Sequence, residues 1–214
     1  MTSLLLEKCE SLTAIEIDKD LIRFLKKTYG DRKNFNLIEK DILLYDPKEL
    51  VRVNKLIGNI PYNISTPIIE WIIDNKSSFD EIFLMLQKEF GERCVAQPNT
   101  KSYGRLSIFV QCFFDVTVIR EVDKSSFSPS PKVQSIFLKL TPKVSDMTPN
   151  SILMKNLSAL TREAFSKRRK LITNSLKSFF TEEDLVNLGI ERESRPENLS
   201  VETYIKLAKS IQSG

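Results

Sequence analysis

The chain has 214 residues, of which 41% are hydrophobic and 28% charged, and its net charge is +4 at neutral pH. This length suffices for one substantial domain and a small appendage, and so small a net charge by itself says little about nucleic acid. The sequence contains no histidine, which excludes Ser-His-Asp triads and histidine-based metal sites. The glycines are too widely spaced for a Gly-rich phosphate loop, and three scattered cysteines predict reduced thiols rather than a metal site. No apolar run approaches the roughly 20 residues of a membrane span and no signal peptide is recognisable, so we expect a cytoplasmic protein without a membrane partner.

Short apolar runs alternate with amphipathic segments as far as about residue 90, which predicts an α/β fold with a parallel, doubly wound (Rossmann-like) sheet. Strands are expected at 12–17, 35–38, 53–57 and 80–87, and helices at 19–29, from Pro67 onward and at 105–114. Two later strands, 116–121 and 133–140, lie close together in sequence and are expected to pair antiparallel at an edge. The chain opens on SLLLEKC, which matches the end of the helix after the first strand of such a sheet. The sequence is therefore expected to begin part-way through its nucleotide-binding half.

A Pro- and Thr-rich linker at 141–150 separates this region from a C-terminal region with helical periodicity. We therefore expect an α/β domain at 1–142 and a small all-helical domain at 143–214. Thr181 with Asp184 matches a capping box, and Ser200 is placed to cap the last helix.

Polar residues follow three of the expected strands. Open α/β sheets bind ligands outside the carboxyl ends of their strands. The carboxylate of Glu16 suits ribose hydroxyls, and that of Asp41 suits an adenine amine, which together favour an adenosine-bearing ligand. The alternative is that each acid is a solvated cap of its strand, and such caps are equally common.

Residues 58–63, GNIPYN, follow the third strand. Gly, Asn and Pro are common turn residues, so a simple turn is one interpretation. The other is a base pocket, because the amide oxygen of Asn59 and the carbonyl of Ile60 could accept both N–H groups of adenine N6. Pro61 would fix the backbone there, and Tyr62 would stack on an extruded base.

Several segments carry a family resemblance. The stretch NIPYNIS at 59–65 resembles the Asn-Pro-Pro-Tyr-type motif of S-adenosylmethionine-dependent amino-methyltransferases, in the extended form found in rRNA adenine N6,N6-dimethyltransferases. Similar segments of that family follow in order: EID at 16–18, KDIL at 40–43, QKEFGER at 87–93, YGRLS at 103–107, FSPSPKVQS at 127–135, FSKRRKLITNSL at 165–176 and RPENLS at 195–200. The resemblance runs from about residue 4 to the end, and its C-terminal segments resemble the enzymes that act on the small subunit. The family's N-terminal Gly-rich cofactor segment has no counterpart in this sequence.

The resemblance implies a methyltransferase that uses S-adenosylmethionine to dimethylate adenine N6 in small-subunit rRNA during ribosome assembly. It implies cofactor contacts at the first two strand ends and at the base-binding motif. It also implies a catalytic set that includes Phe127 as a second aromatic wall, for which the alternative is a core residue under a Pro-rich turn. The expected cofactor-binding residues are Glu16, Ile17, Asp41, Ile42 and Asn59, and the expected catalytic residues are Asn59, Ile60, Pro61, Tyr62 and Phe127. No metal is expected, and the chain is expected to act as a monomer.

Residues 162–177 hold six basic side chains against one acidic side chain. A solvated helix face is the usual explanation for such a run, but contacts to RNA phosphates are the alternative that the resemblance favours. The expected RNA-binding residues are Arg162, Lys167, Arg168, Arg169 and Lys170. Two rival functions remain open from the sequence: a non-catalytic RNA-binding assembly factor on the same fold, and a DNA adenine methyltransferase.

Overall fold

The structure is a computed structural model, and it describes all residues except 51–53, 128–130, 145–147, 149–150 and 212–214. It divides into two compact units, residues 1–50 and 51–214, and each is described by itself.

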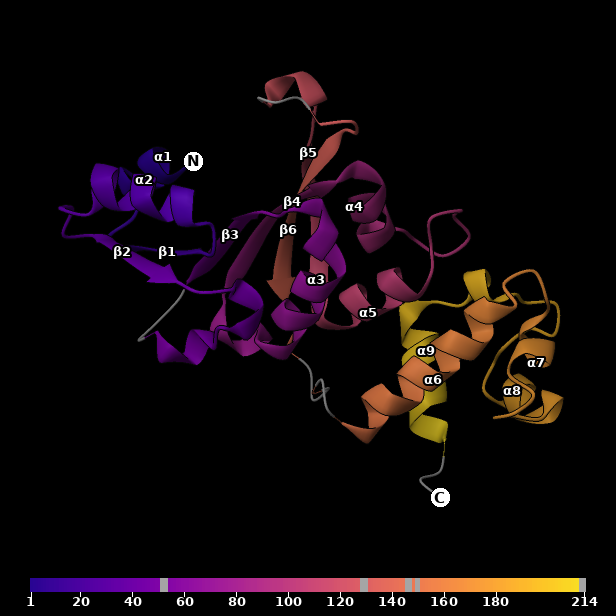
Figure 1. The fold of residues 1–214 in the computed structure, drawn as a ribbon. Coiled ribbons are helices and arrows are strands. Elements are labelled where there is room, and N and C mark those ends of the chain that lie inside the picture. The colour runs from indigo at the N-terminus through magenta and orange to yellow at the C-terminus, as the bar shows by residue number, and fades with distance from the viewer. Residues whose placement is uncertain (51–53, 128–130, 145–147, 149–150, 212–214) are drawn as a thin grey trace. The chain divides into compact units, whose positions relative to one another are not determined.

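The first unit is a two-stranded parallel sheet with two helices. It contains α1 (Thr2–Leu6), β1 (Leu12–Glu16), α2 (Lys19–Tyr29) and β2 (Phe35–Glu39), followed by two short 3-10 turns at Ile42–Leu44 and Pro47–Glu49 (Figure 1). The side chain of Asp18 accepts hydrogen bonds from the backbone of Asp20 and Leu21, which explains where α2 begins. The predicted strands and helix are confirmed. Every residue of β1 is only half-buried, since the sheet of this unit has two described strands and both are edge strands.

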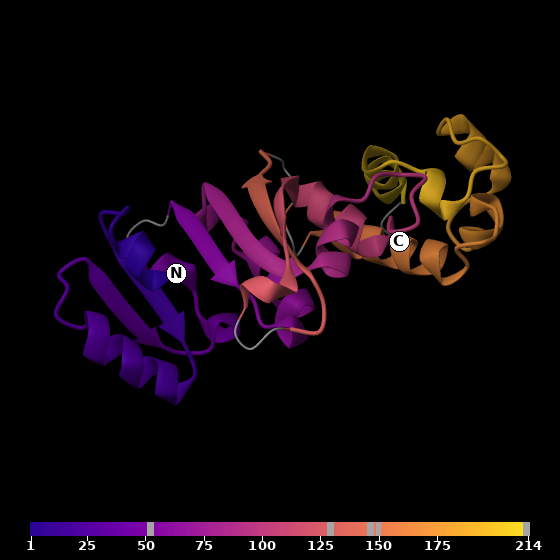
Figure 2. The ribbon, with the colours of Figure 1, turned by 90° about the horizontal axis from the view of Figure 1, so that it is seen from above.

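The second unit is built on a four-stranded sheet. Its strands are β3 (Lys55–Asn59), β4 (Glu81–Gln87), β5 (Phe114–Val122) and β6 (Ser135–Pro142), and their order across the sheet is β3-β4-β6-β5 (Figure 2). The first pair is parallel, whereas β6 runs antiparallel to both of its neighbours. The predicted antiparallel pairing of the two late strands is therefore confirmed, with β5 on the edge.

Three helices of this unit are α3 (Ser65–Asp74), α4 (Lys88–Val95) and α5 (Arg105–Phe113). Alternate residues of β4 are fully buried on one face of the sheet, and α4 packs there so closely that Gly91 faces Ile136 of β6. The helix α3 begins two residues before Pro67 rather than at it, since a proline is tolerated anywhere in the first turn, where the N–H has no helical partner.

The C-terminal region is helical, as expected. It contains α6 (Ile152–Ser166), α7 (Ile172–Ser175), α8 (Glu182–Asn187) and α9 (Val201–Ser210); α6 packs on α9, and both contact α5 (Figure 1). The predicted capping box is confirmed, because Thr181 and Asp184 exchange backbone-to-side-chain bonds of 2.9 and 3.1 Å. Ser200 likewise caps α9. The expected linker lies partly outside the described residues, and the domain boundary after residue 142 stays a prediction.

Within the described part of the chain, no helix combines the length and the apolar character that crossing a membrane requires.

Candidate active site

Several strands of the second unit end or begin at one edge of the sheet, the edge formed by strand ends rather than by an outer strand. Asn59 ends β3 beside Met85, and Gln87 ends β4 opposite Ser135, the first residue of β6. Val122, the end of β5, also lies opposite Ser135. Residues that directly follow β3 and β5 are therefore presented at this edge, and they include most of the expected catalytic residues.

The base-binding motif presents two unused acceptors. The Asn59 side chain is exposed and forms no hydrogen bond with any residue that the structure describes. The N–H of Ile60 donates to the carbonyl of Met85 at 3.2 Å, which holds this backbone against β4. The carbonyl of Ile60 accepts no hydrogen bond from the described residues, and Pro61 itself is extended, at φ −55° and ψ 130°, just before the 3-10 turn Tyr62–Ile64.

Tyr62 is half-buried, and hydrogen bonds hold both its hydroxyl and its backbone. Its hydroxyl lies 2.9 Å from the Ser135 hydroxyl, and its backbone carbonyl accepts a hydrogen bond of 3.0 Å from the hydroxyl of Ser65. Phe127 follows the short 3-10 turn Lys124–Ser126 at the end of β5 and is also half-buried. The loop after Phe127 lies partly outside the described residues, so its predicted role as an aromatic wall stays a prediction.

In the first unit, the two predicted cofactor acids lie at the same edge of their own sheet, since β1 and β2 are parallel and Glu16 pairs with Glu39. One oxygen of each acid is used locally. The Oε1 atom of Glu16 accepts from the N–H groups of Ile17 and Asp18 at 2.8 and 2.9 Å, and Oδ1 of Asp41 accepts from Leu43 at 3.0 Å. The second oxygen of each carboxylate has no partner among the described residues.

The remaining predicted cofactor residues are apolar neighbours of these acids. The side chain of Ile17 is 65% exposed, whereas Ile42, the first residue of the turn that Asp41 caps, is half-buried.

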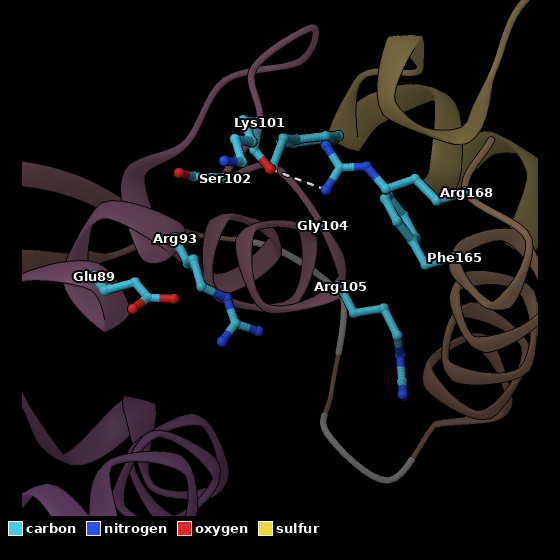
Figure 3. Close-up of a pocket in the computed structure, with 9 residues that line it drawn as sticks. Glu89, Arg93, Lys101, Ser102, Gly104, Arg105, Phe165 and Arg168 are labelled. Carbon is cyan, nitrogen blue, oxygen red and sulfur yellow. Dashed lines mark hydrogen bonds between the residues drawn. The ribbon is translucent and has the colours of Figure 1, made fainter.

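A basic cavity of about 580 Å³ lies elsewhere in the second unit, between α4, α5 and the end of α6 (Figure 3). It is lined by Glu89, Arg93, Lys101, Ser102, Tyr103, Gly104, Arg105, Phe165 and Arg168. Partial burial lowers the pKa of Arg105, and the positive charge of Arg162 lowers it further. Arg93, Lys101 and Arg105 are not among the residues predicted from the sequence, because they come from different elements. Arg93 and Arg105 lie within two of the recognised segments, which is the signal that could have identified them.

The five predicted RNA-binding residues fall into two groups. Arg168 is engaged within the protein: it binds the carboxylate of Glu197 and donates to the carbonyl of Thr100 at 3.2 Å. It also donates to the carbonyl of Lys101 at 2.9 Å (Figure 3). Lys167 pairs with Glu163 at 2.8 Å. The other three, Arg162, Arg169 and Lys170, are exposed and form no ion pair with a described residue.

Comparisons with known proteins agree with the resemblance. The family model described as "Ribosomal RNA adenine dimethylase" matches residues 1–213. The "Ribosomal RNA small subunit methyltransferase A" of Buchnera aphidicola subsp. Acyrthosiphon pisum is 39% identical over 99% of this chain and 78% of its own length. The protein of the same name from Legionella pneumophila (strain Corby) is also 39% identical, over 100% of this chain and 83% of its own.

Two solved structures share the fold. The dimethyladenosine transferase from Plasmodium falciparum superposes with a TM-score of 0.79 at 29% identity, over 96% of this chain and 83% of its own. The 23S rRNA methyltransferase ErmE superposes with a TM-score of 0.73 at 21% identity, over 98% and 85% of the two chains. The predicted Rossmann-like α/β fold with a helical C-terminal region is confirmed by this likeness.

Proposed function

The chain belongs to the ribosomal RNA adenine dimethylase family, and from that premise we propose that it holds its target adenine at the edge where β3 and β4 end. It is an rRNA adenine dimethyltransferase. Our proposal adds that this chain uses S-adenosylmethionine, that its substrate is small-subunit rRNA in an assembling particle, and that it works as a cytoplasmic monomer with a docking domain at 143–214.

The residues of the first unit fit the proposed cofactor. Glu16 and Asp41 each keep one carboxylate oxygen without a described partner, at adjacent strand ends. Such oxygens can accept hydrogen bonds from ribose hydroxyls and from an adenine amine. Ile17 and Ile42 would supply apolar contact beside them.

The observation that carries the proposal is the pair of acceptors at Asn59 and Ile60, neither of which bonds to a residue that the structure describes. Adenine N6 has two N–H groups, and its lone pair is delocalised into the ring. Accepting both N–H groups orients N6 and favours a pyramidal nitrogen whose lone pair is available for attack. Tyr62, and Phe127 from the end of β5, would stack on the extruded base.

S-adenosylmethionine supplies an electrophilic methyl group, so no side chain has to act as a general base before attack. Transfer would form an N–C bond at N6 as the C–S bond of the cofactor breaks, and N6 would then lose a proton to water; the role of Asn59 and Ile60 would be to hold N6 in place. This chemistry is compatible with a sequence that contains no histidine.

We propose that the basic cavity contacts rRNA phosphates. Arg93, Lys101 and Arg105 line it, and Arg162 adds a further cation next to Arg105. Phosphate contacts position a protein on RNA without reading its sequence, so these cations would orient the particle while Asn59 selects the base.

The test is the substitution Asn59→Ala, with Asn187→Ala as a matched control that removes an exposed amide at the end of α8. Transfer of labelled methyl groups to unmethylated small-subunit particles should fall by about a hundredfold or more in Asn59→Ala, as for the loss of a transition-state hydrogen bond. RNA affinity should stay within twofold of the wild type, and the control should keep full activity. Full activity of Asn59→Ala would refute the assigned role. A wild-type protein that binds the particles without methylating them would instead restore the non-catalytic alternative, which the family assignment leaves without support.

A further inference from the structure

Ser135 is a buried residue that contacts Tyr62 of the candidate active site. It is the first residue of β6 and pairs with Gln87 on one side and Val122 on the other, so its backbone is fixed between two strands. Its side chain is fully buried. A buried hydroxyl needs a hydrogen-bond partner, and the partner in this structure is the hydroxyl of Tyr62, which is 73 residues away in sequence and 2.9 Å away in space.

This contact fixes the outer end of the Tyr62 ring. The inner end is already held, because the backbone of Tyr62 follows Pro61 and its carbonyl accepts the Ser65 hydroxyl. The tilt of a tyrosine ring about its second side-chain torsion is otherwise loosely determined. Anchoring the phenol to a strand restricts that torsion.

We propose that Ser135 is a positioning residue for methyl transfer: it holds the Tyr62 ring in the orientation that stacks on the target adenine. The inference rests on the proposed role of Tyr62. A ring that is ordered before the base arrives loses less conformational entropy on binding than a free ring. The role proposed for the phenol oxygen is therefore its hydrogen bond to Ser135, since phenylalanine would offer the same stacking surface without that bond.

A purely structural role for the pair makes a different prediction. If the two hydroxyls only satisfy each other in the core, their removal lowers stability and leaves the turnover of the folded enzyme unchanged. If they position the ring, removal lowers kcat/KM even where the protein is fully folded, and both removals act through the same bond.

The experiment is a double-mutant cycle with Ser135→Ala, Tyr62→Phe and the double variant. Steady-state methyl transfer to unmethylated small-subunit particles is measured at a temperature at which circular dichroism shows every variant folded. Ser175→Ala is the control, because Ser175 is also buried and its hydroxyl donates to the backbone carbonyl of Leu171 in the helical region. Tyr62→Phe keeps the ring and covers the case in which Ser135→Ala does not fold.

Each single variant should lose about threefold to tenfold in kcat/KM, the range expected for one neutral hydrogen bond, and the double variant should lose no more than either. The control should keep wild-type kcat/KM. Unchanged kcat/KM in both single variants, or losses that multiply in the double variant, would overturn the positioning role.

A further variant, Tyr62→Ala, separates this inference from the proposed function. A nearly inactive Tyr62→Ala beside fully active Ser135→Ala and Tyr62→Phe would refute the positioning role alone. A fully active Tyr62→Ala would refute the stacking role of Tyr62 and the positioning role with it.

Discussion

Two neighbouring arginines in the basic run should behave in opposite ways when replaced by alanine. The guanidinium of Arg168 makes three hydrogen bonds within the protein, to Glu197 and to the carbonyls of Thr100 and Lys101, and so joins the end of α6 to the loop before α5. Arg169 is exposed and has no ion pair among the described residues. We therefore expect Arg168 to stabilise the fold and Arg169 to contact RNA.

The magnitude for Arg168→Ala follows from these contacts. Charge-assisted hydrogen bonds are the stronger kind, but the two side chains of the ion pair are 35% and 30% exposed, so water replaces part of what is lost. We expect a loss of about 2 kcal/mol in the free energy of unfolding, which corresponds to a fall of about 4–8 °C in Tm for a chain of this size. The exposed Arg169 should change stability by less than about 0.5 kcal/mol.

The assay combines thermal denaturation with RNA binding over a range of salt concentrations. Each phosphate contact that is lost reduces the slope of log affinity against log salt by about 0.7 to 0.9. Arg169→Ala should show that reduction with an unchanged Tm, whereas Arg168→Ala, measured while folded, should keep the wild-type slope. A reduced slope with a wild-type Tm in Arg168→Ala would refute this division of roles.

Two further predictions concern the core of the second unit and the thiols. Gly91→Ala should lower the free energy of unfolding by about 1–2 kcal/mol, because the added Cβ would overlap Cγ2 of Ile136. This overlap outweighs the better helix propensity of alanine. A urea midpoint at or above that of the wild type would contradict the prediction. Burial raises the pKa of Cys94 and of Cys112 to about 12, so at pH 8 a thiol reagent should label only the partly exposed Cys9 in the folded protein and all three thiols after denaturation. Unfolded thiols ionise near pH 9, whereas these two stay protonated in the folded protein up to about pH 12. Their contribution to the free energy of unfolding is therefore fully present below pH 9 and is lost as the pH rises through about 12. A urea midpoint that stays constant over this range would count against buried thiols.

Local patterns in the sequence predicted the elements well, and they did so where the determining interactions are local. The capping box at Thr181 and the cap at Ser200 are contacts between residues three positions apart. The strands were found because their apolar runs are short and bounded by turn residues. Contacts between distant segments left no such pattern. The bond between Tyr62 and Ser135 joins residues 73 positions apart; both lie in recognised segments, but no local pattern shows that their side chains meet.

The basic cavity illustrates the same limit for charge. Clustering along the sequence pointed to residues 162–177, yet Arg168 there turns inward, and cations from α4 and α5 join the cavity. Which cations are neutralised depends on where the acids lie, and the acid that binds Arg168 is Glu197, 29 positions away. A charge run in the sequence therefore predicts where cations gather, but not which of them the protein neutralises itself.

The candidate residues differ in how many hydrogen bonds their side chains already make within the protein. Those with fewer bonds are better evidence for a ligand. Glu16 and Asp41 each cap the turn that follows their own strand, so the capped-strand interpretation already explains part of their presence. Asn59 has no partner among the described residues, although it ends a strand that pairs with the largely buried β4. Its amide and the neighbouring carbonyl of Ile60, neither of which bonds to a described residue, are better explained by a ligand with two N–H groups than by a turn. The substitution Asn59→Ala should therefore cost the protein little stability while it removes activity, and the reverse result would favour the turn.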